Sequence, residues 1–135
     1  SSLDNQDYVY AKILKVGDGE VSPLFTDSVV VNYCGKLIPT KAYPKGYIFD
    51  QNFYGDIEDE ENQKIMVPTT FCVGALVDGW TTSLQKMHVG DIWRLYIPQS
   101  MGYGEKGSSQ GNIPGNSTLV FDLYLTNIKK PANKK

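Results

Sequence analysis

Histidine is almost missing from this 135-residue chain, which contains only His88. Nucleophilic catalysis by a Ser-His-Asp or Cys-His set needs a histidine as its base, but His88 stands among residues typical of a helix end, so we expect no such set. Two cysteines, Cys34 and Cys72, are too few for a disulfide scaffold and cannot complete a zinc site with one histidine. We therefore expect no metal, and we interpret both cysteines as small core residues.

An excess of positive charge is absent as well. The chain has 13 Lys and Arg against 15 Asp and Glu, and its net charge is −2. Binding to a phosphate backbone needs a basic surface, so the sequence predicts no nucleic-acid partner. Five carboxylates lie between residues 56 and 61, but they lack the glycine and oxygen spacing of a calcium-binding EF-hand loop. We interpret this segment as a solvated acidic loop.

Long apolar runs are also lacking. No stretch approaches the roughly 18–20 residues that a membrane-spanning helix needs, so none is predicted. A content of 41% hydrophobic and 21% charged residues lies in the globular range. We expect a flexible N-terminal segment over residues 1–7, one folded domain over 8–130 and a basic tail over 131–135.

Runs of β-branched and aromatic residues, bounded by turn residues, predict strands along most of the chain. The three consecutive valines after Ser28 are the strongest of these signals. Residues 38–69 and 101–117 are rich in Gly, Pro and Asn and indicate long loops. The expected strands cover residues 8–16, 28–37, a short stretch around 47–49, 70–73, 91–97 and 118–128.

A helical period appears only between residues 76 and 87. Val77, Trp80, Leu84 and Met87 share one face over about three turns, and Gly90 suits a left-handed cap after them. Five or six antiparallel strands with one short amphipathic helix predict an α+β fold, in which a twisted antiparallel sheet wraps around the helix as a half-barrel. Such a sheet leaves a hollow where helix, sheet and long loops meet, and nine tyrosines are available to line it.

The G-x-G-x-x-G pattern at residues 102–107 resembles a dinucleotide fingerprint. No helix is expected to open after it, so we reject the match and expect no cofactor. Polar groups in apolar blocks are more informative. Asp50 follows Phe49, and Tyr103 lies between two glycines. Taken singly, such aromatic residues are usually core, but together they favour a lined pocket.

Five ordered blocks carry a family resemblance, which covers residues 8–130. The blocks are VNYCGKL (31–37), IFDQN (48–52), VDGWTTSLQKMHVGD (77–91), MGYGEKG (101–107) and NIPGNSTLVFDLYL (112–125). In this order they resemble the blocks of the FKBP-type peptidyl-prolyl cis/trans isomerases, the FK-binding immunophilins. The sequence around Trp80 is closest to the bacterial Mip-like branch of that family.

The resemblance implies roles for ten residues. Trp80 would form the floor of a prolyl pocket, Asp50 and the Tyr103 hydroxyl would be its polar contacts, and the backbone amide of Val77 would bind a ligand carbonyl. Thr69 stands where the family commonly has another pocket aromatic, so one wall is expected to be thinner. The implied catalytic residues are Tyr33, Phe49, Asp50, Trp80, Tyr103 and Phe121, and the implied substrate-binding residues are Leu76, Val77, Ile113 and Thr69.

The implied activity is the acceleration of X-Pro bond rotation in proline-containing peptides and unfolded proteins, without a cofactor. Macrolides such as tacrolimus or rapamycin are implied ligands, bound more weakly if the wall at Thr69 is thin. Two alternatives stay open: a low-turnover immunophilin that acts as a proline-peptide-binding or chaperone module, and an unrelated open β-barrel ligand binder.

Two further expectations concern the state of the protein. A monomer is expected, because the helical dimerisation arm of some relatives has no counterpart in this sequence. The start without Met and the Mip-like resemblance favour a trimmed protein of the bacterial periplasm or cell envelope. A cytoplasmic protein that carries the remnant of a tag is the alternative.

Overall fold

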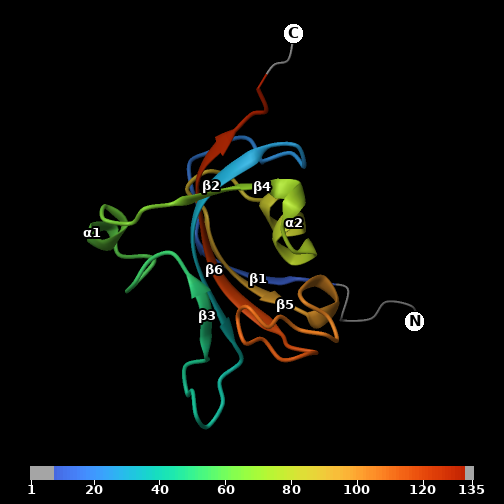
Figure 1. Ribbon diagram of the computed structural model, residues 1–135. Coiled ribbons are helices and arrows are strands. Elements are labelled where there is room, and N and C mark those ends of the chain that lie inside the picture. The colour runs from blue at the N-terminus through green and yellow to red at the C-terminus, as the bar shows by residue number, and fades with distance from the viewer. Residues whose placement is uncertain (1–7, 133–135) are drawn as a thin grey trace.

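The computed structural model describes residues 8–132 (Figure 1). Six strands, two short α-helices and two 3-10 turns follow one another within these residues. Their bounds are β1 Tyr10–Lys15, β2 Ser28–Leu37, β3 Ile48–Gln51, α1 Glu60–Gln63, β4 Thr69–Cys72, η2 Val73–Ala75, α2 Asp78–Leu84, β5 Ile92–Ile97, η3 Gln99–Met101 and β6 Leu119–Lys129.

One antiparallel sheet contains all six of these strands, in the order β1-β5-β6-β2-β3. The strand β4 pairs with residues 28–31 of β2, and β3 pairs with residues 34–36 of the same strand. One edge of β2 is therefore covered by two short strands, with residues 52–68 inserted between them. The sheet bends around α2, which lies on its concave side (Figure 1). The predicted α+β half-barrel is confirmed.

Asn52 closes the break between β3 and β4. Its Oδ1 accepts a hydrogen bond from the Tyr33 amide at 2.8 Å, and its Nδ2 donates to the Val31 carbonyl and the Thr69 hydroxyl, both at 3.0 Å. These bonds satisfy backbone groups of β2 at the point where the ladder is interrupted. They fix the position of Tyr33 relative to both short strands.

The main core lies between α2 and the concave face of the sheet. Alternate residues of β2 and β6 point toward the helix, because successive side chains of a strand face opposite ways. Val29, Val31, Leu123 and Leu125 are fully buried there, as is Leu84 from the helix. The predicted apolar face of the helix is confirmed by this packing.

The helix is shorter than the three turns predicted from its pattern. It covers Asp78–Leu84, because the backbone of Val77 is not helical, with a φ of −58° and a ψ of 149°, and Val77 forms the N-cap. After Leu84 the chain makes 3-10 type bonds, from Lys86 to Ser83 and from Met87 to Leu84. Met87 thus keeps its place in the core without belonging to the α-helix. Gly90 has a φ of +96°, but it lies in the turn that the Asp91 amide closes on the His88 carbonyl. The C-cap of the helix is Gln85, so the expected cap at Gly90 is wrong.

The predicted strands agree with the observed ones to within about two residues at each end. The insertion 52–68 differs from the expected loop, because it contains the single helical turn α1, capped by the Asp59 carboxylate. Phe53 and Ile57 anchor this insertion on the convex side of the sheet, against Ile92. Its acidic residues are exposed, as predicted.

The interpretation of both cysteines as core residues is wrong. Cys72 is exposed, because it alternates with Phe71 on β4 and faces away from the core. Cys34 is half-buried and packs against the smaller cluster on the convex side. Within residues 8–132, no helix is long and apolar enough to cross a membrane. The proposed segment 1–7 lies outside the described residues, as do residues 133–135 of the proposed basic tail.

Candidate active site

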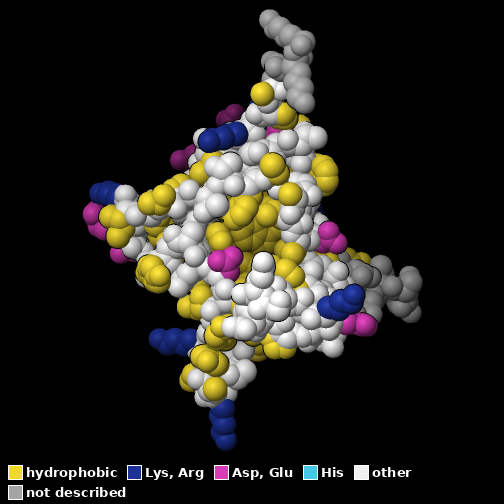
Figure 2. All heavy atoms as spheres, in the orientation of Figure 1, with side chains coloured by type: hydrophobic (Ala, Val, Ile, Leu, Met, Phe, Trp, Pro, Cys, Tyr) yellow, Lys and Arg dark blue, Asp and Glu magenta, His cyan; other side chains and the backbone are white. Residues whose placement is uncertain are grey.

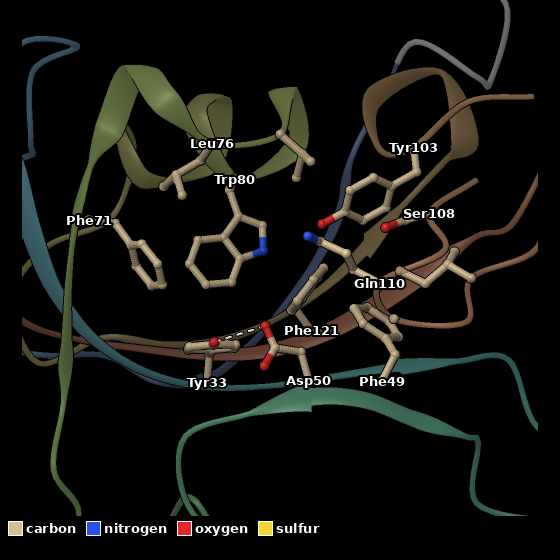
Figure 3. Close-up of a pocket in the computed structure, with 13 residues that line it drawn as sticks. Tyr33, Phe49, Asp50, Phe71, Leu76, Trp80, Tyr103, Ser108, Gln110 and Phe121 are labelled. Atoms are coloured by element: carbon tan, nitrogen blue, oxygen red, sulfur yellow. Dashed lines mark hydrogen bonds between the residues drawn. The ribbon is translucent and has the colours of Figure 1, made fainter. Parts of the chain in front are cut away.

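A half-open pocket of about 350 Å³ lies between the start of α2, the concave face of the sheet and the loop that follows η3. Figure 2 shows it as a hollow with a hydrophobic floor and a carboxylate at its rim, and Figure 3 shows the side chains around it. Residues from β2, β3, β4, α2, β6 and two loops meet here. The lining residues are Tyr33, Phe49, Asp50, Phe71, Leu76, Val77, Trp80, Tyr103, Ser108, Gln110, Gly111, Ile113 and Phe121.

Trp80 forms the floor of this pocket. It lies in the first turn of α2, only 4% of its surface is exposed, and three rings meet the indole edge-on. The ring centroids of Tyr33, Phe71 and Phe121 lie 5.2, 5.7 and 5.1 Å from that of the indole. Edge-to-face pairs of this kind fix ring orientation and contribute about 0.5–1.5 kcal/mol each. The floor is therefore rigid and preorganised.

The indole nitrogen of Trp80 has no hydrogen-bond acceptor among the described residues, although it is buried. It points toward the side of the pocket where Tyr103 and Gln110 lie (Figure 3). A buried N–H without a partner costs about 1–3 kcal/mol, so this atom favours a ligand that brings an acceptor.

Polar groups lie among the aromatic rings of the pocket lining. The Tyr33 hydroxyl donates a hydrogen bond to Asp50 Oδ2 at 2.9 Å (Figure 3). Burial raises the pKa of Tyr33 well above its ordinary value, and the Asp50 carboxylate adds to this effect. Burial also raises the pKa of Tyr103, again with a smaller contribution from Asp50. Both phenols therefore stay protonated at neutral pH and remain hydrogen-bond donors.

Gly35 allows the rings of one wall to meet. Phe49 and Phe121 pack edge-on with centroids 5.4 Å apart, directly over this residue of β2. A Cβ at position 35 would lie 2.4 Å from the Phe121 ring and 2.8 Å from the Phe49 ring. Carbon atoms prefer separations of about 3.5–4.0 Å, so any larger side chain here would displace both rings. Gly35 lies in the VNYCGKL block, but nothing in the sequence predicted this role for it.

Nine of the ten predicted site residues lie together in the pocket lining. The exception is Thr69, whose hydroxyl accepts a hydrogen bond from Asn52 and which does not line the pocket. Phe71 lines the pocket instead and supplies an aromatic ring to this wall. The expectation of a thinner wall is therefore wrong. The two residues share one side of β4, and only the strand register decided which of them reaches the indole.

Sequence reasoning also missed Gln110 and Gly111, which come from the irregular loop after η3. No periodic pattern marks residues in such a loop. Phe71 had a usable signal, since it lies in a predicted strand and is the one aromatic residue of that strand.

The chemistry open to the pocket is limited. Asp50 is the one charged side chain among the described lining residues, and no Ser, Cys or Lys there is paired with a histidine. Within residues 8–132, no three His, Cys, Asp or Glu side chains come together as metal ligands. The geometry suits a compact apolar ring bound against the indole, with an attached carbonyl near Tyr103.

The half-barrel with an aromatic pocket beside its helix defines the fold and the candidate site, and comparison with known proteins identifies the class of protein. Residues 19–126 match the family model described as FKBP-type peptidyl-prolyl cis-trans isomerase. The chain belongs to this family. The predicted resemblance is confirmed, and the unrelated β-barrel ligand binder considered from the sequence is excluded.

Several relatives are identical to the chain at about a third of the aligned positions. It is 35% identical to the peptidyl-prolyl cis-trans isomerase Mip of Coxiella burnetii, over 88% of this chain and 44% of that protein. It is 37% identical to the macrophage infectivity potentiator of Trypanosoma cruzi, over 90% and 53% of the two chains. The chain thus spans about half the length of the curated relatives it matches.

Solved structures of the family have the same fold. The peptidyl-prolyl cis-trans isomerase of Pseudomonas syringae superposes with a TM-score of 0.70 at 30% identity, over 90% of this chain and 76% of that one. FkpA from Escherichia coli superposes with a TM-score of 0.71 at 32% identity, over 92% and 49% of the two chains.

Proposed function

We propose that the protein is a peptidyl-prolyl cis/trans isomerase that accelerates rotation about X-Pro bonds in protein substrates and so assists folding. Family membership supports the class of activity, and the pocket built on Trp80 is the observation that carries the proposal for this chain. The reaction needs neither a nucleophile nor a bond-breaking step, which agrees with a lining that offers one carboxylate and several aromatic rings.

The first task of the pocket is to hold the prolyl ring. A pyrrolidine ring is compact and apolar, and it can lie flat against the indole of Trp80 between Tyr33 and Phe121. Burying this ring removes apolar surface from water at roughly 25 cal/mol per Å². The ring is then fixed while the chain on the other side of the C–N bond remains free to turn.

The second task is to favour the twisted amide over the planar one. Rotation has a barrier of about 18–20 kcal/mol, because the planar amide is stabilised by resonance. Twisting breaks this resonance and lowers the polarity of the carbonyl, so a water-poor aromatic site disfavours the planar ground state more than the transition state. Each ~1.4 kcal/mol of preferential transition-state binding accelerates exchange tenfold.

The polar groups of the pocket orient the turning group. The Tyr103 hydroxyl lies across the pocket from Asp50 and can donate to the carbonyl as it leaves the amide plane (Figure 3). Tyr33 holds the Asp50 carboxylate in place through its 2.9 Å hydrogen bond. We assign Tyr103 and Asp50 to direct contact with the substrate, and Tyr33 to contact with the ring and positioning of Asp50.

The experiment measures cis/trans exchange of a short X-Pro peptide by NMR, with wild-type protein and two tryptophan variants. Trp80→Leu removes the pocket floor. Trp93→Leu is the matched control, since Trp93 also has a buried indole nitrogen without a partner but does not line the pocket. We expect Trp80→Leu to lose most of the catalytic rate and Trp93→Leu to keep it, with folding of both variants checked by urea unfolding.

Three outcomes separate the alternatives. Acceleration that depends on Trp80 supports the proposal. Binding of the peptide without acceleration favours the low-turnover binding or chaperone module. Acceleration that survives Trp80→Leu in a folded protein refutes the assignment of this pocket.

We further propose that the same pocket binds macrolides such as tacrolimus or rapamycin and that the chain is a monomer. Phe71 supports the first proposal, because it completes the aromatic wall that the sequence left open. Competition between a macrolide and the X-Pro peptide tests binding, and sedimentation analysis tests the monomer.

A further inference from the structure

The loop that joins β2 to β3, residues 38–47, forms a second hollow beside the pocket. We call it the hairpin groove. Its volume is about 350 Å³, and its lining residues are Leu37, Ile38, Thr40, Tyr43, Tyr47 and Asn112. Ile38 and Tyr43 are 53% and 50% exposed. Figure 2 shows hydrophobic side chains below the central hollow, where the hairpin lies in Figure 1.

The hairpin groove adjoins the pocket at two elements. Phe49 lines the pocket, and Tyr47 lines the groove. Both residues are half-buried and the intervening Ile48 is exposed, which is the alternation of a strand with Tyr47 and Phe49 on the same side. Gly111 and Asn112 are consecutive in one loop, and they line the pocket and the groove respectively. The two hollows therefore share a wall.

A hydrogen bond ties the shared loop to the hairpin. Asn112 Nδ2 donates to the Tyr47 hydroxyl at 3.3 Å, and the Tyr47 ring meets Tyr43 edge-on at 5.1 Å. Asn112 has a φ of +55°, a left-handed conformation that asparagine tolerates better than most residues. This backbone turn places its side chain amide on the hairpin side of the wall.

The hairpin groove is preformed by bonds within the loop. The amide of Tyr43 donates to the Thr40 hydroxyl at 3.1 Å, and the Tyr43 carbonyl accepts from the amides of Thr40 and Gly46. The φ of Gly46 is +92°, and a Cβ there would lie 2.4 Å from the Leu37 carbonyl oxygen. A ligand would thus bind here without the cost of ordering the loop.

We propose that the hairpin groove binds an aromatic or large aliphatic side chain of the same polypeptide whose proline occupies the pocket. The inference rests on the proposed function and names its substrate class: X-Pro sites with a bulky apolar residue a short distance away along the chain. Residues two apart on one side of a strand lie about 7 Å from each other. An extended substrate therefore spans the two hollows with an offset of two to four residues, or roughly 7–14 Å.

The test compares peptides that differ in one residue. Each contains one X-Pro bond, with Phe placed two, three or four residues from the proline on either side, and the reference peptide has Ala at all these positions. NMR measures kcat/KM for exchange and, separately, the shifts of backbone amides 37–47 on titration. The variants are Tyr43→Ala and the matched control Tyr10→Ala, which changes a tyrosine 79% exposed on β1.

We expect at least one Phe peptide to exceed the Ala peptide about fivefold in kcat/KM on the wild-type protein, as one well-placed aromatic contact would give. Tyr43→Ala should reduce this ratio toward one without changing the rate on the Ala peptide. Tyr10→Ala should leave both unchanged. A preference that persists in Tyr43→Ala, or the absence of any preference on the wild-type protein, overturns the inference.

The two readouts separate this inference from the proposed function. If no peptide is accelerated but Phe peptides bind more tightly and shift amides 37–47, the groove is supported and the isomerase proposal fails. If peptides are accelerated without preference, the isomerase stands and the groove fails. Concentration-dependent dimerisation that Tyr43→Ala abolishes also overturns the inference, because a second copy of the chain then occupies the groove.

Discussion

Adding one methyl group at Gly35 should impair the pocket without removing any group that lines it. In Gly35→Ala the new Cβ would lie 2.4 and 2.9 Å from two carbons of the Phe121 ring and 2.8 Å from the Phe49 ring. Each distance must grow by about 1 Å to reach ordinary carbon contact. Phe121 is buried and packs against Trp80, so it has little room, whereas Phe49 can turn outward at the pocket edge.

Two opposing effects set the size of the change in stability. Alanine in a strand gains about 0.5–1 kcal/mol over glycine, because the unfolded chain loses less conformational freedom. Overpacking of a well-packed site costs about 1–3 kcal/mol. We expect the second effect to win, with a net loss of about 1–2 kcal/mol in the free energy of unfolding.

The effect on catalysis should be larger than the effect on stability. A misplacement of about 1 Å in a positioning group can reduce rates by up to about 100-fold. We therefore expect kcat/KM of Gly35→Ala to fall by roughly 10- to 100-fold, measured by NMR exchange on an X-Pro peptide under conditions where urea unfolding shows the protein to be folded.

Gly74→Ala is the control for this variant. A Cβ there would lie 2.7 Å from the ring of Phe25, which is 58% exposed and free to move, and neither residue lines the pocket. We expect wild-type kcat/KM from it. If Gly35→Ala had wild-type stability and activity, the positions of the Phe49 and Phe121 rings would not depend on a glycine at position 35. That result would refute the role assigned to Gly35.

Three further predictions concern single groups. Tyr103→Phe should lower kcat modestly, and an unchanged rate would remove its hydroxyl from the mechanism. Since the pKa values of Tyr33 and Tyr103 are raised, kcat/KM should show no loss from tyrosine ionisation up to about pH 10. Above that pH, Tyr33 ionises in the unfolded chain before it ionises in the folded protein, so the free energy of unfolding should fall as pH rises. This fall should be less steep in Tyr33→Phe. Equal slopes of the free energy of unfolding against pH in the two proteins would contradict the raised pKa of Tyr33. Asn52→Ala should lose about 1–3 kcal/mol of stability, measured by urea unfolding. Asn62→Ala is the control, with a smaller expected loss, because the hydrogen bonds of Asn62 are exposed whereas those of Asn52 are partly buried.

Local patterns were enough to identify most elements of the fold. The valine run predicted β2, and the spacing of Trp80, Leu84 and Met87 predicted the face that covers the sheet. Both signals are local, because strand propensity and helical period act over a few residues. The predicted end of α2 was less accurate, because the 3-10 bonds after Leu84 keep Met87 in the core without extending the α-helix.

The grouping of site residues came from the family resemblance rather than from periodicity. The resemblance indicated nine residues that the structure brings into one pocket, and eight of them lie in the ordered blocks. Thr69 was misplaced because the sequence does not reveal where the insertion 52–68 rejoins the sheet. Register with β2 decides this, and it moves the aromatic position to Phe71.

The sequence by itself determined the family, the strands, the helix face and the aromatic character of the site, because all of these follow from local composition and order. Only the tertiary structure decided that Gly35 supports two rings, that Tyr33 holds Asp50, and that a hairpin groove adjoins the pocket. Each depends on residues from separate strands or loops meeting within a few ångströms. Such distances are fixed by strand register and loop conformation, which side-chain chemistry alone does not specify.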